Sequence, residues 1–307
     1  MKLSIISPVY KAESIVDELV LRIKLEASKI TEDFEIILVE DGGTDASWKR
    51  IQENCTKDLR IKGIKLSRNF GQHYAVTAGI SKAKGDNIIL MDCDLQDDPV
   101  YIKELYEERQ KGYEIVFTRR KKRKHGLFKS FNSFIYNKLF VIFSEKKYDI
   151  NAGSLVLFST KVSKAFLQLK DNDRLYLQML KWVGFSNTTI EVEHKPRFSG
   201  ISSYNFFKLL KIGLQGWTSH SVKLLRFSTY FGFVLAFFSF LAALSIIIRY
   251  IFFEFLPGWP SIIISILFST GLILLSIGIA GLYIGKIFEQ TQERPLFIIE
   301  EEININE

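Results

Sequence analysis

The sequence predicts an α/β domain built on a mostly parallel sheet, followed by two membrane-spanning helices. Over residues 1–120, short and nearly all-apolar runs alternate with amphipathic stretches, which is typical of strands that helices cover on both faces of a sheet. Near the C-terminus, residues 227–248 and 255–285 contain no charged side chain. Each of these stretches exceeds the ~20 residues that a helix needs to cross a bilayer.

The expected elements of the first part follow one another in alternation. The runs 3–7, 35–40, 61–66, 87–91 and 114–118 are expected as strands, because apolar and β-branched residues fill them. The stretches 14–29, 45–54, 72–84 and 100–111 carry helical patterns. The apolar core that follows Met1 is too short for a signal peptide, so we interpret it as the first strand.

The rest of the chain divides into further segments. A second region of the domain begins with six consecutive cationic residues, 119–124, and continues through an amphipathic stretch at 127–143. Residues 204–226 mix bulky apolar side chains with lysines, which is typical of a helix lying in the membrane interface. The predicted organisation is therefore a domain over 1–203, an interfacial helix over 204–226, two transmembrane helices over 227–286 and a cytoplasmic tail over 287–307.

The two uncharged stretches are expected to form a hairpin. The Pro-Gly-Trp-Pro sequence at 257–260 breaks helices between them; buried helices of a soluble core are the alternative. Lysines and arginines flank both ends of the hairpin, whereas its connector offers only Arg249. By the positive-inside rule, both ends of the hairpin are expected on the cytoplasmic side of the inner cell membrane. Cys55 and Cys93 form no metal or redox motif, which agrees with a reducing compartment.

Four carboxylates lie within residues 92–98, directly after the fourth expected strand. They would repel one another unless a hard cation with oxygen ligands compensates them. Asp92 and Asp94 lie two residues apart and point to the same side of an extended backbone. With Gln96 they form a candidate ligand set for Mg²⁺ or Mn²⁺ that also holds a diphosphate. The alternative is a solvated acidic turn that opens the next helix, and we assign Asp97 and Asp98 to supporting or helix-capping roles.

Polar residues follow three other expected strands. They are Pro8 and Tyr10, then Glu40 and Asp41, and then Arg68. Ligands collect at the carboxyl ends of parallel strands, so these residues predict a nucleotide site. The carboxylates can accept from the N–H groups of a uracil or guanine, and Arg68 can reach the base or a phosphate.

Alternatives stay open at these positions. Asp41 could be an N-cap of the next helix, although Thr44 or Asp45 already fills that role, and Arg68 could be a surface arginine. The sequence contains no G-x-G-x-x-G after the first strand and no P-loop lysine motif, which disfavours a dinucleotide-binding Rossmann site.

The cationic run is the candidate site for an anionic acceptor. Arg119 and Arg120 are expected to bind the phosphate of a lipid, because the planar guanidinium matches phosphate oxygens, and Arg123 is a further candidate. The later lysines are expected to contact anionic head groups. Nucleic-acid binding is the other common use of a basic run, and the adjoining hairpin disfavours it.

Several motifs together resemble a known family. They are Ser7 to Tyr10, Val39 to Asp45, Leu66 to Gly71 and Met91 to Asp97, with further matches at 197–204, 283–286 and 293–295. In this order they resemble family 2 glycosyltransferases of the polyprenyl-phosphate sugar transferase type, which include dolichol-phosphate mannose synthase and the bacterial undecaprenyl-phosphate glucosyltransferases. The resemblance covers residues 2–299.

The resemblance implies a GT-A fold and inverting transfer of one sugar from a UDP- or GDP-sugar to a polyprenyl (undecaprenyl) phosphate at the cytoplasmic membrane face. By motif match, metal and diphosphate would lie on Asp92, Asp94 and Gln96. The nucleotide pocket would comprise Pro8, Tyr10, Glu40, Asp41, Arg68 and Asp92. Catalysis would rest on Asp94, Arg119 and Arg120, with the acceptor phosphate on Arg119, Arg120 and Arg123.

The sequence also departs from the family pattern. The usual Asp-Asp-Gly-Ser block reads Glu-Asp-Gly-Gly at 40–43, and Ser154 stands where many relatives carry an acidic residue. A phosphate acceptor is already ionised near neutral pH, with a second pKa of about 6, so it needs little help from a base. A sugar hydroxyl would need one, and Asp149, Asp171 and Asp173 would then be the candidates.

The sequence contains one further motif and leaves two rival functions open. Residues 178–182 superficially resemble the Q-x-x-R-W motif of processive synthases, and we interpret them as an amphipathic helix near the acceptor opening. The rival functions are a transferase that extends a lipid-linked oligosaccharide, and a non-catalytic membrane partner that keeps the fold. The hairpin also makes a homo-oligomer possible.

Overall fold

The computed structural model describes residues 2–121, 152–193, 223–252 and 258–305. The chain falls into two compact units. One unit comprises Met1–Lys124, Asp149–Ser202 and Arg294–Glu307, and the other comprises His125–Tyr148 and Ser203–Glu293. The last residues of the chain thus belong to the same unit as the first.

The first unit is built on an eight-stranded sheet in the order β7-β5-β6-β4-β1-β2-β3-β8. Four strands run parallel at its centre and on one side, in positions that match the sequence prediction: β1 (Leu3–Val9), β2 (Phe34–Glu40), β3 (Ile61–Leu66) and β4 (Asn87–Leu90). The fifth predicted strand is β5 (Ile115–Arg120). The prediction of an α/β domain is confirmed, and its sheet is mixed, with four of its seven strand pairings parallel.

Three strands complete the sheet beyond those that the sequence predicted. β6 (Ala152–Ser159) lies antiparallel between β4 and β5, and β7 (Asn187–Val192) pairs with β5 in parallel. β8 (Ile299–Ile303) pairs antiparallel with β3 and forms one edge of the sheet. The pairing with β7 extends β5 to its end, because Arg119 lies opposite Glu191 and Arg120 opposite Val192. The two arginines are therefore the last residues of the strand, not the first residues after it.

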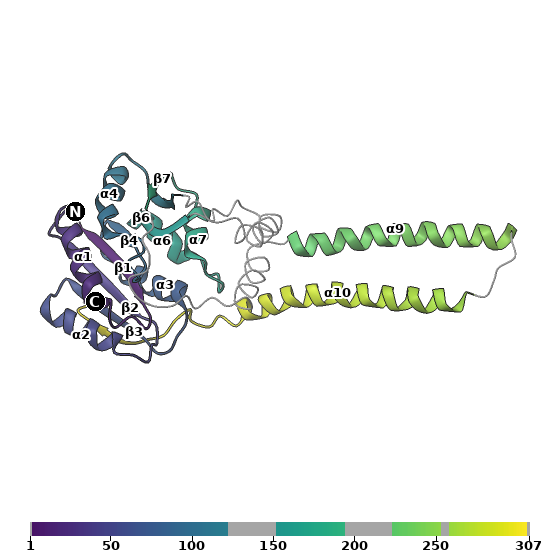
Figure 1. Cartoon of the computed structure of the whole chain (residues 1–307), viewed down its shortest axis with the longest axis horizontal. Coiled ribbons are helices and arrows are strands. Elements are labelled where there is room, and N and C mark those ends of the chain that lie inside the picture. The colour runs from purple at the N-terminus through teal and green to yellow at the C-terminus, as the bar shows by residue number, and fades with distance from the viewer. Residues whose placement is uncertain (1, 122–151, 194–222, 253–257, 306–307) are drawn as a thin grey trace. The chain divides into compact units, whose positions relative to one another are not determined.

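Helices cover both faces of the sheet (Figure 1). One face packs against α1 (Val16–Ser28), α2 (Ser47–Lys57) and α4 (Ile102–Gln110). The short helix η1 (Pro99–Tyr101) directly precedes α4. The other face packs against α3 (Gln72–Lys82), α6 (Thr160–Gln168) and α7 (Tyr176–Trp182). In β2, Ile36 and Leu38 join the first core, while Ile37 and Val39 join the second. Alternate side chains point to opposite faces, so a strand buried on both faces must be apolar throughout.

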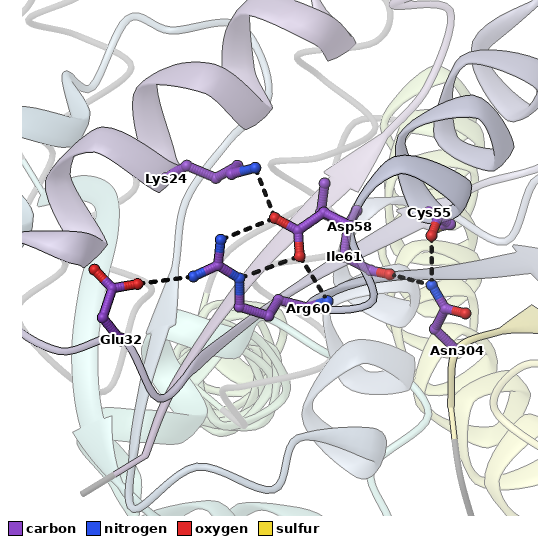
Figure 2. Close-up of polar contacts among 7 residues, drawn as sticks. All are labelled: Lys24, Glu32, Cys55, Asp58, Arg60, Ile61 and Asn304. Carbon is purple, nitrogen blue, oxygen red and sulfur yellow. Dashed lines mark hydrogen bonds and ion pairs between the residues drawn. The ribbon is translucent and has the colours of Figure 1, made fainter.

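A cluster of charged residues fixes the turn that enters β3. Figure 2 shows Asp58 between Lys24, whose Nζ lies 2.6 Å away, and Arg60, whose Nη2 lies 3.0 Å away. Arg60 also donates to Glu32 at 3.0 Å. Hydrogen bonds from Arg60 hold the pKa of Asp58 well below its usual range. This cluster lies where strands begin, so its role is structural.

The end of the chain is tied to the same region. In Figure 2, Asn304 donates from Nδ2 to the backbone oxygens of Cys55, at 2.8 Å, and Ile61, at 2.9 Å. The backbone of Asn304 is left-handed, with φ of 58°, which asparagine tolerates better than most residues. Trp48 and Gln52 of α2 donate to the carboxylate of Glu301. Residues that follow the second apolar helix therefore complete the first unit.

The second unit contains two long apolar helices, α9 (Lys223–Phe252) and α10 (Trp259–Thr291). They lie side by side in Figure 1. Their segments Leu225–Ile246 and Ser261–Thr291 have mean hydropathies of 2.0 and 2.5 and are long and apolar enough to cross a membrane. Of the predicted interfacial helix, only 223–226 falls among the described residues, as the start of α9; the stretch at 127–143 lies outside them.

Candidate active site

The carboxyl ends of β1, β2 and β4 lie side by side. Val9 is paired with Glu40, and the next amide, of Asp41, donates to the carbonyl of Val9 at 2.9 Å. On the other side of β1, the amide of Met91 donates to the carbonyl of Ile6 at 3.0 Å. The polar segments that leave these three strands are therefore neighbours at one edge of the sheet. Ligands of parallel α/β sheets bind at this edge.

Asp41 joins the ends of β2 and β3. It is 3% exposed, and its carboxylate accepts from the backbone N–H groups of Phe70, at 2.8 Å, and Gly71, at 2.9 Å. Burial raises the pKa of Asp41, and these hydrogen bonds oppose the rise. Gly42 allows this approach, since it has φ of +61° and a Cβ there would lie 2.2 Å from the backbone of Arg68.

The side chain of Glu40 binds the turn that directly follows β2. Its carboxylate accepts from the N–H groups of Gly42 and Gly43, and burial raises its pKa despite these bonds. Asp45 stands at the start of α2, where it accepts from the Ser47 hydroxyl at 2.8 Å. The N-cap of α2 is Ala46, which offers no capping side chain, so Asp45 lies one residue before the cap and Asp41 is engaged elsewhere.

Pro8, Tyr10 and Arg68 differ in exposure. Pro8 is buried within β1, whereas Tyr10 is 46% exposed directly after that strand. Arg68 is also exposed, and its guanidinium lies 4.2 Å from the centre of the Phe70 ring. Tyr10 and Arg68 therefore present planar groups to solvent beside the buried carboxylates, and planar groups suit the binding of a nucleotide base.

A tight loop holds the acidic residues at the end of β4. Leu95 is 3% exposed and has φ of 55°, a conformation that bulky residues rarely adopt. Its side chain joins the hydrophobic core, while Asp92, Asp94 and Gln96 stay half-buried. The N–H of Gln96 donates to Asp94 at 3.1 Å. An anchored leucine thus leaves the three predicted metal ligands at the accessible side of the loop.

Asp92 lies in a strongly negative environment. Burial, followed by the negative charges of Asp94 and Asp97, raises its pKa to about 6. Ser154 and the positive charge of Arg120 oppose this rise. Gln72, at the start of α3, donates to Asp92 at 2.6 Å. Sequence reasoning missed Gln72 because only the fold brings this helix start to the acidic loop.

The acidic loop suits a hard divalent cation. Two carboxylates and an amide oxygen are ligands that Mg²⁺ and Mn²⁺ accept, and such a set leaves coordination positions for phosphate oxygens. Burial first, and the charge of Asp94 second, raise the pKa of Asp92, and a bound cation would favour its ionised form. Within the described ranges, no cluster of three or more His, Cys, Asp or Glu residues is arranged as a metal site.

The remaining residues of the acidic run have structural partners. Asp98 caps η1 by accepting from the N–H of Val100 at 3.1 Å, as the sequence predicted. Asp97 is 1% exposed and accepts from both the backbone N–H and the hydroxyl of Ser154. Burial, then the charges of Asp92 and Asp94, raises the pKa of Cys93 to about 12, so this thiol is not a nucleophile near neutral pH.

The cationic residues lie on the neighbouring part of the sheet. Arg119 is exposed, and Arg120 is half-buried with its Nη2 3.9 Å from Asp97. Arg123 lies outside the described residues, as does Asp149. Asp171 is exposed and Asp173 half-buried, in the segment that precedes α7.

The segment at 178–182 lies in α7. The Nζ of Lys181 lies 5.2 Å from the centre of the Phe117 ring, while Trp182 is 63% exposed. Met179 and Leu180 are buried, so α7 is an amphipathic helix, as expected from its sequence.

Comparisons with known proteins agree with this arrangement. The family model Glycosyl transferase family 2 matches residues 4–167. The uncharacterized glycosyltransferase YkcC of Bacillus subtilis (strain 168) is 33% identical over 304 residues, which cover 98% of this chain and 94% of that protein. The bactoprenol glucosyl transferase of Shigella phage SfV is also 33% identical over 304 residues, which cover 98% of this chain and 99% of the phage protein.

Among solved structures, glucosyl-3-phosphoglycerate synthase from Mycobacterium tuberculosis, in complex with Mn²⁺ and uridine-diphosphate-glucose, has a TM-score of 0.49 and 13% identity. The match covers 71% of this chain and 77% of that chain.

The family resemblance that the motifs predicted is confirmed. The family model covers more than half of the chain, and relatives align over nearly all of it, the two apolar helices included. The mixed sheet with helices on both faces is the GT-A type that the resemblance implied. This chain belongs to glycosyl transferase family 2.

Proposed function

We propose that this glycosyltransferase moves one sugar from a UDP- or GDP-sugar to a polyprenyl (undecaprenyl) phosphate, with inversion at the anomeric carbon. One observation carries the proposal: a bactoprenol glucosyl transferase matches this chain across 98% of its length, through both apolar helices. A relative that shares only the sheet would support sugar transfer in general. A relative that shares the sheet and the apolar helices supports a lipid acceptor.

The donor would bind at the carboxyl ends of β1, β2 and β3. Tyr10 and Arg68 offer exposed planar groups, and Pro8 lies at the end of β1. Asp41 and Glu40 hold the turn after β2 through bonds from backbone N–H groups, and their carboxylates would be the acceptors for the base or the ribose. The donor diphosphate would then extend toward the acidic loop after β4.

The acidic loop would hold the reacting end of the donor. Asp92, Asp94 and Gln96 would bind Mg²⁺ or Mn²⁺, which would neutralise the negative charge that develops on the leaving diphosphate. The hydrogen bond from Gln72 fixes Asp92, and the turn at Leu95 fixes the spacing between Asp94 and Gln96. The loop is thus shaped before a donor arrives.

The acceptor phosphate would lie on Arg119 and Arg120, with Arg123 as a further candidate. An ionised phosphate is itself the nucleophile and brings no proton that a base must remove near neutral pH. Ser154 in place of an acid is compatible with this acceptor, because its side chain already donates to Asp97. A sugar hydroxyl would need a base that this position does not supply.

The chain would span the inner membrane twice, with its catalytic unit in the cytoplasm. Both helices are long and apolar enough, and lysines and arginines are more numerous beside the hairpin than in its connector, which offers only Arg249. Labelling of single engineered cysteines in intact cells tests this topology: a cysteine at the connector should react with an impermeant reagent, and one near the C-terminus should not. The reverse pattern would contradict the proposed sidedness.

A transfer assay tests the reaction. Purified chain in detergent, supplied with Mn²⁺, a radiolabelled UDP- or GDP-sugar and undecaprenyl phosphate, should yield a labelled lipid. Asp94→Asn should lower turnover by at least about 100-fold, because it removes a carboxylate from the diphosphate site. Asp98→Asn is the matched control, since Asn is also a good N-cap, and it should stay within about twofold of wild type.

Two results would contradict the proposal. No labelled lipid with any donor, in protein that is folded and binds nucleotide, would rule out bare polyprenyl phosphate as the acceptor. A product that forms only on a lipid-linked saccharide would favour the rival transferase. Full turnover by Asp94→Asn would overturn the assignment of the acidic loop.

A further inference from the structure

Asp97 is the most deeply buried carboxylate of the acidic loop, and the proposed reaction does not yet use it. Its side chain is 1% exposed, whereas those of Asp92 and Asp94 are half-buried. Oδ2 of Asp97 accepts from the Ser154 N–H at 3.0 Å and from the Ser154 hydroxyl at 2.5 Å. Two donors from one residue of β6 thus fix the position of this oxygen.

The same oxygen faces Arg120. Nη2 of Arg120 lies 3.9 Å from Oδ2 of Asp97, and in the part of the chain that the structure describes no other carboxylate lies within ion-pair distance of this guanidinium. The Nε of Arg120 is buried and makes no hydrogen bond with any described residue. Asp97 is thus the charged partner of Arg120 among the described residues, and Nε of Arg120 is a buried donor that no described residue uses.

We infer that Asp97 is a positioning residue, which holds the Arg120 guanidinium in the direction that receives the acceptor phosphate; the inference rests on the proposed function. An arginine that is free to rotate loses side-chain entropy when a ligand immobilises it, and this loss opposes binding. An arginine already held by a buried carboxylate has met part of this cost before the acceptor binds. Asp97 would therefore favour acceptor binding without touching the acceptor.

The attachment to Ser154 explains why a buried carboxylate suits this role. β6 lies between β4 and β5, so Ser154 stands between the acidic loop after β4 and the arginine at the end of β5. Asp97, Ser154 and Arg120 thus form a chain of contacts between the proposed diphosphate site and the proposed acceptor site.

A double-mutant cycle tests the inference in the full-length enzyme. Asp97→Asn, Arg120→Gln and the double variant are assayed with UDP-glucose, Mn²⁺ and undecaprenyl phosphate, and kcat and KM are determined for both substrates. Asp97→Asn should raise the acceptor KM by about tenfold and leave the donor KM within about twofold of wild type. In the Arg120→Gln background the same change should alter the acceptor KM by less than about twofold, because Asp97 acts through Arg120.

Equal effects of Asp97→Asn in both backgrounds would overturn the inference, as would a donor KM that rises as much as the acceptor KM. Asp98→Asn removes a charge from the next residue and should leave both KM values unchanged. If Asp97→Asn does not fold, Ser154→Ala replaces it in the cycle. It should raise the acceptor KM by about threefold only when Arg120 is present, and an unchanged KM would overturn the inference.

A second readout does not need turnover. Inorganic phosphate should protect Arg120 of the wild type from phenylglyoxal, as mapped by mass spectrometry, and should protect it less in Asp97→Asn. Equal protection would overturn the positioning role whatever the acceptor is. If the wild-type enzyme makes no labelled lipid in the transfer assay, the proposed function fails, but the protection experiment still tests the positioning role of Asp97. The failure of the function and the failure of the positioning role can therefore be told apart.

Discussion

At the scale of single residues, Glu35 shows how this fold keeps a buried charge. Its side chain is 2% exposed, and the Nζ of Lys62 lies 2.5 Å from its Oε2. Ser4 and the backbone N–H of Lys84 donate to the other oxygen. Burial alone would raise the pKa of Glu35, but these hydrogen bonds outweigh it and hold the pKa below its ordinary value of 4.5.

The lowered pKa gives the fold a pH dependence. The unfolded chain binds more protons than the folded chain in acid, so the contribution of Glu35 is present above pH 4.5 and is lost as the pH falls through the folded-state value. Glu35→Gln should lower the free energy of unfolding by about 3 kcal/mol at neutral pH, because it leaves Lys62 buried without a counter-charge. Denaturant titrations of the detergent-solubilised chain, followed by fluorescence over a series of pH values, measure the loss.

The control for this prediction removes both charges. Glu35→Gln with Lys62→Met should unfold at a higher denaturant concentration than Glu35→Gln alone, since a neutral buried pair costs less than a lone charge. The single variant and the wild type should converge in acid. A difference that stays constant across the pH series would contradict the assignment of the shift to Glu35.

The residues of the site were predictable to different extents. Asp92, Asp94 and Gln96 could be singled out because they are close in sequence and follow an apolar strand. Gln72, Ser154 and the pairing of Asp97 with Arg120 could not, because strand order alone brings them together. The carboxylate of Asp41 was predicted at the site, but its hydrogen bonds to the β3–α3 turn depend on the close approach at Gly42, which no local pattern reveals.

At the scale of elements, β8 is the strand whose sequence gives the weakest indication of a strand. Its sequence, Ile-Glu-Glu-Glu-Ile, has three consecutive acidic residues where a strand pattern would alternate. The edge position explains this composition, because charged side chains protect an exposed edge from pairing with other chains. Lys65 and Lys82 form ion pairs with Glu300 and Glu302. By contrast, β1 to β4 are buried on both faces, and their apolar runs predicted their boundaries within two residues.

Asn304 should be the main polar anchor of β8. Asn304→Asp keeps the shape and the left-handed backbone but removes the donors to Cys55 and Ile61 and places a charge beside their carbonyls. It should destabilise the unit by about 2 kcal/mol and speed amide exchange along β8, as measured by hydrogen–deuterium exchange. Glu300→Gln breaks only an exposed ion pair and should cost less than about 1 kcal/mol. Similar exchange in the two variants would contradict the anchoring role.

At the scale of the whole molecule, the apolar helices stand in sequence between two parts of one folded unit. The sheet uses residues on both sides of α9 and α10, since β7 precedes them and β8 follows them. The C-terminal segment was expected from the sequence to be a tail, because nothing in a charged segment of this length indicates a partner strand 230 residues upstream, at β3.

A comparison of two shortened chains tests this arrangement. One chain ends at residue 222, and the other replaces residues 223–291 by a Gly/Ser linker of roughly 20 residues, which behaves as a flexible coil. The linker chain retains β8 and should melt at least about 4 °C higher, because each kcal/mol shifts the midpoint of a unit of this size by about 2–4 °C. Calorimetry or a thermal-shift assay gives the midpoints. Equal midpoints would show that β8 adds nothing to stability.

The position of β8 also sets an order of events during synthesis. The ribosome releases β8 after the other strands of the described sheet and after both apolar helices, so β3 keeps an unpaired edge for as long as the hairpin is being made. An open edge is the part of a nascent sheet that is prone to pair with other chains. The sugar-transfer unit of this protein can therefore reach its full sheet only after its apolar helices exist, which makes their synthesis a step in the folding of the enzyme.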